Sequence, residues 1–191
     1  TFVSLSGFAM DNMTRDMGWR LHIVGRRIER LDTLAGSLAR FLRRHVDIAG
    51  PLQRELAVEA LLELCDSIIT YRTRYRAQPE LLPAIHLLTM DGANPHALAF
   101  QVRMLTNYLR NFEMDGNELG IDELDASYIA LQRFPWARLE ATAPEDERAE
   151  ATLALADQLD HLTRAGRTLS DRLAMRFFSH VGGAGQATFA A

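Results

Sequence analysis

The chain has 191 residues, 48% of them hydrophobic, and a formal net charge of −4. This length can bury one sizeable core or two small ones, and without an apolar run of about 18 residues the sequence offers no membrane-spanning helix. The acidic balance provides no overall attraction to nucleic acid or to an anionic membrane surface.

The cysteine content indicates the compartment of the protein, and the first residue indicates whether the chain is part of a longer one. The lone Cys65 excludes a disulfide framework within the chain, so we expect a reducing compartment and a cytoplasmic location. The chain begins with Thr1 and shows no secretory signal. We therefore expect it to be part of a longer protein.

All 21 basic residues are arginine, and lysine does not occur. A GC-rich genome that favours arginine codons is one explanation. The other is chemical, because the planar guanidinium binds carboxylate and phosphate through two hydrogen bonds and tolerates burial in ion pairs better than an ammonium does. The two explanations are compatible.

A long first helix is predicted over Asp11–Arg44. Apolar residues recur every three or four positions from Met10 to Leu42, which is a helical spacing. Such a helix is about 50 Å long at 1.5 Å per residue, and its single apolar side is typical of a bundle member. Ser4 and Ser6 are candidate N-caps, and Gly50-Pro51 predicts the end of this helix and the start of the next.

The second helix is predicted over Pro51–Arg76, antiparallel to the first. We expect its inward side to carry Leu56, Ala57, Ala60, Leu61, Leu64, Cys65, Ile68, Tyr71 and Tyr75. An acidic stripe of Glu55, Glu59, Glu63 and Asp66 follows the other side. No acidic residue stands three positions before a histidine, as in a di-iron bundle, so a solvated or arginine-paired face is the preferred interpretation.

Two arginines fall on the predicted inward side of the second helix. Arg72 follows Ile68 by four residues, and Arg76 comes one turn later. An unpaired buried charge is strongly destabilising, so burial of these side chains would require carboxylate partners or a bound anion.

Two further helices follow in the middle of the chain. Leu81–Thr89 is predicted to be short and apolar, ending at Asp91-Gly92. Asn94 as N-cap and Pro95 as first residue predict a helix that runs to about Met114. Gln101 falls within its inward set, so we expect this amide to bond a neighbouring helix or a ligand.

The last third of the chain predicts a helix from Asp122 toward Leu139, kinked or broken at Pro135. The final helix should begin near Pro144, with acidic residues in its first turn, and run to roughly His180. Gly166 lies on its inward side and predicts a close helix approach.

These elements predict an all-α fold, a bundle of five to seven mostly antiparallel helices with long first, second and last members. We expect residues 1–181 to form a single domain and residues 182–191 to be a disordered tail. No stretch has the pattern of a strand, and no repeat with a period of about 20 to 50 residues occurs.

Common catalytic templates are missing. The sequence contains no Gly-rich phosphate loop with a lysine, no dinucleotide fingerprint, no HExxH pair and no G-x-S-x-G elbow. Cys65 lies among apolar residues and is interpreted as a core thiol. The six histidines show no ligand spacing, and only His180 remains a candidate for histidine chemistry. We therefore predict no metal site, no cofactor and no assigned catalytic residue.

A constellation of arginines remains, carried by the first helix and by the end of the second. One interpretation is a buried network of ion pairs that fixes helix register, and the other is a pocket that binds an anion or a peptide carboxylate. The candidate binding residues are Arg15, Arg26, Arg27, Glu29, Arg30, Tyr71, Arg72, Tyr75, Arg76 and Gln101.

Several motifs in a fixed order resemble one bacterial family. They are the segments 6–15, Gly18-Trp19-Arg20, 25–30 with Glu29-Arg30, 71–75, Asn94-Pro95 with 99–101, and 178–180. Together these motifs resemble the Alpha-E family of all-helical proteins, over its C-terminal two thirds. The resemblance implies that an earlier helix, which would pack beside Asp11–Arg44, is absent, leaving an apolar face for a partner or a second copy. His96 departs from the arginine that the family tends to place after Asn-Pro.

The resemblance implies an association with circularly permuted ATP-grasp proteins, and hence with amide or peptide-bond formation. The implied role is an accessory helical domain that docks on such a ligase or binds its peptide or anionic substrate. The alternative is a peptide-processing or small-molecule enzyme that uses Glu29 with an arginine pocket. A circularly permuted ATP-grasp protein and a second copy of the chain are the candidate partners, whereas nucleic acid and membrane are disfavoured.

Overall fold

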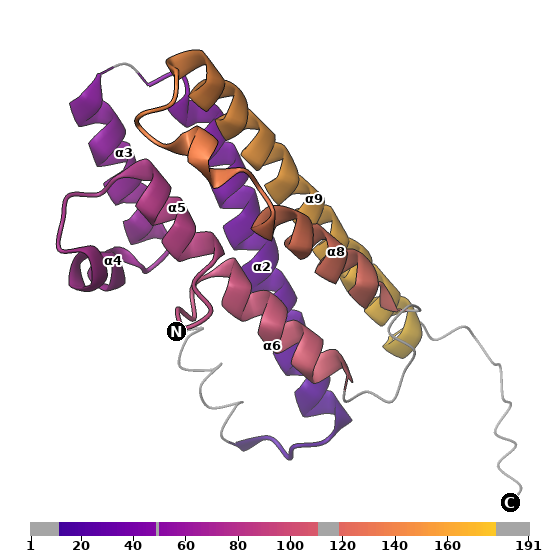
Figure 1. The fold of residues 1–191 in the computed structure, drawn as a ribbon. Helices are drawn as coiled ribbons and strands as arrows, with labels where there is room; N and C mark the ends of the chain where they lie inside the picture. Colours follow the sequence, from indigo (N-terminus) through magenta and orange to yellow (C-terminus); the bar gives the residue numbers. More distant parts are fainter. Residues whose placement is uncertain (1–11, 49, 111–118, 179–191) are drawn as a thin grey trace, which may run out of the picture.

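The structure, a computed structural model, describes residues 12–48, 50–110 and 119–178 (Figure 1). Helices joined by turns and loops make up the described residues, with no strand among them, which confirms the predicted all-α bundle. The elements are α2 (Met17–His45), α3 (Pro51–Leu64), α4 (Ile68–Tyr75), α5 (Leu81–Thr89), α6 (Leu98–Arg110), α8 (Ile121–Gln132), the 3-10 helix η1 (Trp136–Leu139) and α9 (Glu145–Phe177).

The two longest helices, α2 and α9, run antiparallel through the bundle and pack along each other (Figure 1). Asp16 caps α2, and its Oδ1 accepts a hydrogen bond from the Trp19 backbone N–H at 3.0 Å. The helix therefore begins at Met17, later than predicted. The α9 helix begins after Pro144 with three acidic residues in its first turn, where the helix dipole favours negative charge.

A close contact lies at the centre of this pair. Leu31 of α2 is fully buried, and a Cβ added at Gly166 of α9 would lie 2.8 Å from Leu31 Cδ2. Only a glycine leaves room for this approach, which confirms the prediction for Gly166. Exposed ion pairs flank the contact: Arg43 Nη2 lies 2.6 Å from Asp160 Oδ2, and Arg167 Nε lies 2.6 Å from Asp32 Oδ1.

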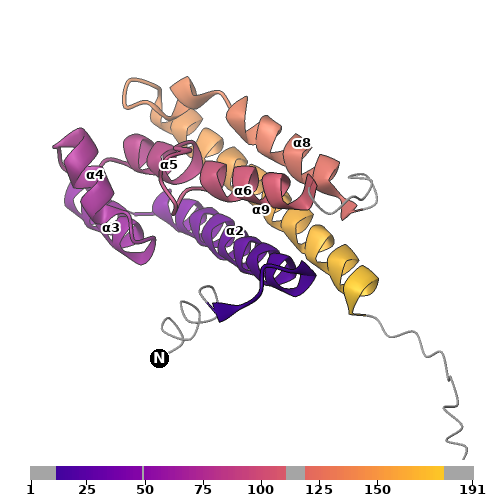
Figure 2. The same ribbon diagram turned by 90° about the horizontal axis from the view of Figure 1, so that it is seen from below.

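The α6 and α8 helices pack against the pair formed by α2 and α9. The α6 helix packs against α2, and α8 packs against α9 (Figure 2). Pro135 separates α8 from η1, as predicted. The α6 helix begins at Leu98, not at Pro95, because the Asn94 side chain accepts from the His96 backbone N–H and closes a turn there.

The predicted continuous helix Pro51–Arg76 is wrong. Asp66 adopts a left-handed backbone with φ 50°, which ends α3 and separates it from α4. The hydroxyl of Ser67 donates to the Cys65 carbonyl at 3.0 Å and accepts from Asn94 Nδ2 at 3.3 Å. Asp and Ser offer the backbone such local alternatives to a helix, and the distant Asn94 holds this one in place.

The inward side predicted for α3 is also wrong in part. The residues of α3 that are buried are Val58, Leu61 and Leu62, whereas Leu56 is 55% exposed and Leu64 is 73% exposed. Both sides of this helix are apolar, so periodicity alone could not distinguish the core side from the outer side.

None of the described helices combines the length and the apolar content needed to cross a bilayer. The candidate caps Ser4 and Ser6, the expected stretch from 111 to Met114, His180 and the predicted tail 182–191 lie outside the described residues.

The Gly166 contact generates a stability prediction. Gly166→Val should lower the free energy of unfolding by about 1–3 kcal/mol, because the added atoms would overpack against Leu31. Gly25→Val is the matched control on α2: a Cβ there meets nothing within 4 Å, so the change should lie within about 0.5 kcal/mol. Urea unfolding measures both. Equal effects of the two substitutions would contradict the close packing.

Candidate functional site

The arginines predicted to gather in one place belong to two separate parts of the fold. Arg26 on α2 is half-buried, whereas Glu29 and Arg30 are exposed on the same helix. Arg15, just before α2, is exposed and lies with its guanidinium 5.4 Å from the centre of the Trp19 ring. Arg72 and Arg76 belong instead to α4 and its C-cap.

Of the candidate binding residues on α2 and just before it, Arg27 is the one with a side-chain hydrogen bond to another described residue. Its Nη1 donates to Gln101 Oε1 on α6 at 3.2 Å, and its guanidinium lies 5.3 Å from the centre of the Phe100 ring. Gln101 is buried and also donates to the Pro95 carbonyl. Burial lowers the pKa of Arg27, and the nearby charge of Arg30 lowers it further. Gln101 therefore bonds a neighbouring helix, the first of the two alternatives expected for it.

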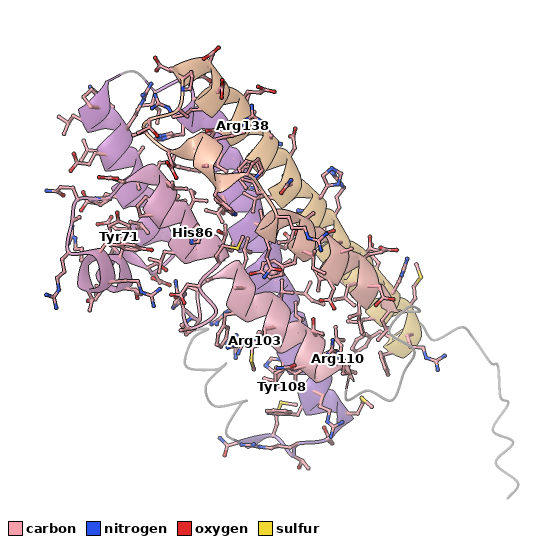
Figure 3. All side chains as sticks on the ribbon, in the orientation of Figure 1. Tyr71, His86, Arg103, Tyr108, Arg110 and Arg138 are labelled. Atoms are coloured by element: carbon pink, nitrogen blue, oxygen red, sulfur yellow. The ribbon has the colours of Figure 1, made fainter. Side chains whose placement is uncertain are left out.

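The candidate binding residues on α4 lie in a different part of the fold, where Figure 3 labels Tyr71. Tyr71 is buried, and its hydroxyl donates to the Gln78 carbonyl at 3.2 Å and accepts from the Glu80 backbone N–H at 3.1 Å. This pair of bonds holds the connection from α4 to α5. Tyr75 is partly exposed, with its ring centre 4.7 Å from that of Tyr71. Burial raises the pKa of the Tyr71 hydroxyl.

The predicted burial of Arg72 and Arg76 is wrong. Both residues are exposed, and Arg72 forms an ion pair with Glu59 of α3. The physical reason is the break at Asp66, which turns α4 away from the continuation of α3 and changes the direction in which its side chains point. Among the described residues, Arg27 bonds α6 and Arg72 bonds α3, so the predicted arginine network between the first two helices does not form there.

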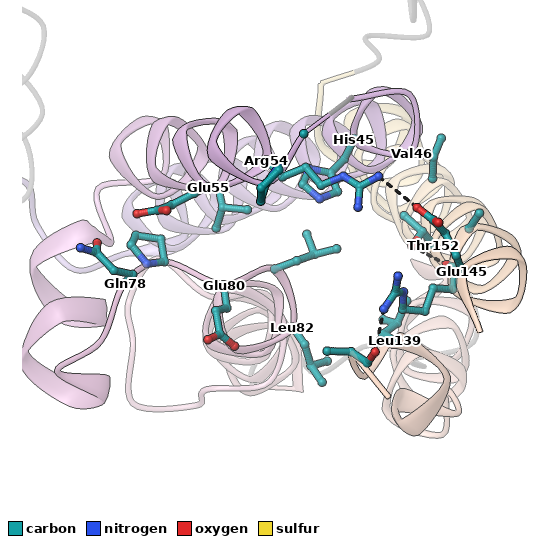
Figure 4. Close-up of a pocket in the computed structure, with 18 residues that line it drawn as sticks. His45, Val46, Arg54, Glu55, Gln78, Glu80, Leu82, Leu139, Glu145 and Thr152 are labelled. Atoms are coloured by element: carbon teal, nitrogen blue, oxygen red, sulfur yellow. Dashed lines mark hydrogen bonds and ion pairs between the residues drawn. The ribbon is translucent and has the colours of Figure 1, made fainter. Parts of the chain in front are cut away.

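An open cavity of about 700 Å³ lies at one end of the bundle (Figure 4), and we call it the end cavity. The C-terminal end of α2 borders it, together with the N-terminal ends of α3, α5 and α9 and the end of η1. Its size falls within the range of about 300–1,000 Å³ that is typical of small-molecule sites. The first turns of three helices therefore border one space, together with the last turn of α2, which carries the opposite partial charge.

The basic side of the end cavity carries two arginines from different helices. Arg54 of α3 donates from Nε to the Ile48 carbonyl at 2.9 Å, and its Nη2 lies 3.3 Å from Glu145 Oε1. Arg148 of α9 donates to the Ala141 carbonyl at 2.8 Å. Arg148 follows Glu145 by three residues, so both lie on the same face of α9. The backbone bonds hold the two guanidinium groups at the wall.

The opposite side of the end cavity is acidic. Glu55 of α3 and Glu80, the N-cap residue of α5, both lie on the side away from the guanidinium of Arg54, at separate points of the wall (Figure 4). Apolar side chains separate the two charged sides, among them Val58, Leu82 and the buried Leu139. The cavity is thus dipolar, with an apolar lining between a basic and an acidic side.

His45 is the most deeply buried ionisable residue of the cavity lining. It is 8% exposed, and its Nδ1 has no hydrogen-bond partner among the described residues. Burial lowers the pKa of His45, and the positive charge of Arg54 lowers it further. The imidazole is therefore held neutral against the cavity wall at neutral pH.

The residues of the end cavity were not predicted from the sequence. One signal was available, because His45 follows Leu38 and Leu42 at helical spacing and so places an ionisable group on the buried stripe of α2. Arg54, Glu80 and Arg148 gave no such signal. Their proximity depends on how four helix ends meet, which no local pattern shows.

The described residues contain no group of three or more His, Cys, Asp or Glu side chains that could hold a metal ion. Burial raises the pKa of Cys65 to about 11, so its thiol is protonated at neutral pH. This agrees with the interpretation of Cys65 as a packed thiol.

The lowered pKa of His45 generates a pH prediction. Above about pH 6.5 the imidazole is neutral in both the folded and the unfolded chain. As the pH falls below that value, the unfolded chain gains a proton that the folded chain resists, so the free energy of unfolding should decrease. One proton gives at most about 1.4 kcal/mol per pH unit.

Urea unfolding between pH 7.5 and pH 5 measures this slope. His45→Gln should flatten it, whereas His161→Gln, which removes an exposed imidazole on α9, should keep the wild-type slope. An unchanged slope in His45→Gln would contradict the assignment.

Sequence comparisons place the chain among bacterial relatives. Uncharacterized protein Rv2567 of Mycobacterium tuberculosis strain H37Rv and uncharacterized protein Mb2597 of Mycobacterium bovis are each 28% identical to it over 155 residues. The aligned segment covers 81% of this chain and 17% of each relative. The chain thus corresponds to a small part of these longer proteins. No solved structure matches it.

The sequence model of one family, described as "a predicted alpha-helical domain with a conserved ER motif", matches residues 1–178. The chain contains two Glu-Arg pairs, Glu29-Arg30 on α2 and Glu147-Arg148 on α9, and the second of these arginines lines the end cavity. The match covers nearly the whole chain, and the structure is helical as the description requires. The chain belongs to the Alpha-E family.

Proposed function

We propose that this chain is an accessory, non-catalytic helical domain that docks on a protein partner through the outer side of α3. The partner we propose is a circularly permuted ATP-grasp protein of an amide-forming or peptide-forming ligase system in the cytoplasm. This choice of partner rests on the family resemblance, whereas the docking surface is argued from the residues of α3.

The observation that supports docking is a row of exposed leucines, which we call the α3 leucine stripe: Leu52, Leu56 and Leu64. They are 61%, 55% and 73% exposed. Leu52 and Leu56 are four residues apart and Leu64 follows eight residues later, with the exposed Ala60 between, so they lie along one side of the helix. The opposite side of α3 faces the core.

A helix that is apolar on both sides is typical of one buried on both sides. Single exposed leucines are ordinary on protein surfaces, but a contiguous apolar row along a whole helix is typical of an interaction site. The exposed Ile69 of α4, at 78%, adds a further large apolar side chain to this part of the molecule.

The charges around the stripe indicate what kind of surface would fit it. Glu63 is exposed on α3 next to the leucines, and Glu59 is partly exposed beside Arg72. Two copies of α3 facing each other would bring these carboxylates together, which disfavours a homodimer through this face. A partner surface with an apolar centre and a basic rim would be complementary.

The alternative of an enzyme that uses Glu29 with an arginine pocket receives less support. Glu29 and Arg30 are exposed on α2, and Arg72 forms an ion pair on α3. A general acid or base needs a substrate position within hydrogen-bond reach and a neighbouring group that shifts its pKa. The described surroundings of Glu29 provide no such enclosure.

Co-purification with the ATP-grasp protein of the same organism tests the docking proposal. The wild-type chain should co-elute with it, and the double variant Leu56→Ser with Leu64→Ser should bind at least about tenfold more weakly, since two anchors of the interface are lost. Leu153→Ser, at a 42% exposed leucine of α9, is the matched control and should bind as the wild type does.

Separate elution of the two wild-type proteins at high micromolar concentration would contradict the choice of partner. Equal binding by the wild type and the double serine variant would contradict the choice of surface. If the chain alone elutes as a dimer that the double variant abolishes, a second copy occupies the stripe and the proposal is wrong.

A further inference from the structure

We propose that the end cavity binds a small zwitterion with an apolar side chain, an amino acid or a short peptide with free ends. This inference uses residues other than the α3 leucine stripe and does not depend on the docking proposal. It rests on the opposed charges of the cavity and on its apolar lining.

The basic side of the cavity suits a carboxylate. Arg54 and Arg148 already hold backbone carbonyls through one N–H each, at 2.9 and 2.8 Å, and this fixes the position of their planar groups. A guanidinium has five donor hydrogens, so each arginine can still donate to a carboxylate. The first turns of α3 and α9 border the same region.

The carboxylate of Glu145 lies near the basic side of the cavity but leaves both arginines accessible to a ligand. Glu145 is 75% exposed and lies 3.3 Å from Arg54, which describes a weak surface pair and not a buried one. A ligand carboxylate that enters the cavity would be less exposed to solvent and could replace Glu145 as the partner of Arg54. The carboxylate of Glu145 would then turn toward water at little energetic cost.

The acidic side suits an ammonium group. Glu55 and Glu80 come from different helices and lie on the same side of the cavity (Figure 4). No ion pair of either carboxylate is found among the described residues, and the Glu80 backbone N–H is already bonded to Tyr71. A ligand ammonium could pair with either carboxylate.

The lining between the charged sides suits an apolar body. Val58, Leu81, Leu82 and Leu139 supply aliphatic surface, while His45 presents a neutral ring at the cavity wall. A neutral imidazole also adds no charge that would disturb the balance of the two sides.

Other ligand classes fit the cavity less well. A nucleotide or polyphosphate would bring several negative charges against Glu55, Glu80 and Glu145. A purely apolar molecule would cover charged groups of the lining without offering them hydrogen bonds in place of water. A zwitterion satisfies both charged sides with a single molecule.

Isothermal titration calorimetry with the dipeptide Leu-Leu and the full chain tests the inference. Leu-Leu should bind with a dissociation constant of about 0.1–1 mM, as expected for a ligand of its size in an open site. N-acetyl-Leu-Leu and Leu-Leu-amide, which each lack one charge, should bind at least about tenfold more weakly. Free leucine and tri-leucine determine whether an amino acid or a peptide fits best.

Variants assign each charge to its side of the cavity. Glu55→Gln with Glu80→Gln should weaken Leu-Leu but leave N-acetyl-Leu-Leu unchanged, and Arg148→Gln should weaken Leu-Leu but leave Leu-Leu-amide unchanged. Arg164→Gln, at an exposed arginine of α9 outside the cavity, is the matched control and should bind as the wild type does. Circular dichroism confirms that each variant is folded.

The peptide comparisons need only the wild-type chain, so an unfolded variant does not leave the inference untested. Absence of binding of leucine, Leu-Leu and tri-leucine at several millimolar would overturn it. Blocked peptides that bind as tightly as Leu-Leu would overturn it equally, because neither charged side would then contribute to binding. Neither result bears on the α3 leucine stripe.

Discussion

The contact between α2 and α9 is the constraint on which the rest of the structure depends. Leu31 packs where Gly166 lacks a side chain, and this brings the backbones of the two longest helices close together. Both helices keep an apolar stripe over many turns, so the pair buries a continuous core from Val24 to Leu42 on one side. The α6 and α8 helices then cover this pair, and the ends of α2 and α9 determine where the end cavity opens.

A rigid central pair leaves α3 and α4 as a smaller unit at the edge of the bundle (Figure 1). The left-handed residue Asp66 and the bonds of Ser67 separate these two helices, and Tyr71 holds the connection that follows. Because α3 packs on the core with only one of its apolar sides, its other side is exposed, and that is the side we propose for a partner. The same unit supplies Arg54 and Glu55 to the end cavity, so a partner on α3 and a ligand in the cavity would act on one helix.

Much of this architecture could be predicted from the sequence, because the long helices have clear periodicity and clear ends. The stripe that includes Leu31 and Leu38 predicted α2, and Gly50-Pro51 predicted the turn into α3. The break at Asp66 could not be predicted in this way, since Asn94 holds the adjacent Ser67 across 27 residues of sequence. The prediction that Arg72 is buried was wrong for the same reason. Gln101 was recognised as a buried amide, but its partner Arg27 depends on how α6 crosses α2. The end cavity was missed because His45, Arg54 and Arg148 meet only in three dimensions.

Amide hydrogen exchange of the isolated chain tests the central claim most directly, namely that a stable α2–α9 pair carries a less stable α3–α4 unit. Central amides of α2 and α9 around Leu31 and Gly166 should exchange only through global unfolding, at the full free energy of unfolding. Amides of α3 and α4 should exchange through local opening at a clearly lower free energy, since they pack on the core from one side only. If α3 and α4 exchange as slowly as the centre of α2 and α9, the division of the fold into a rigid pair and an edge unit is wrong.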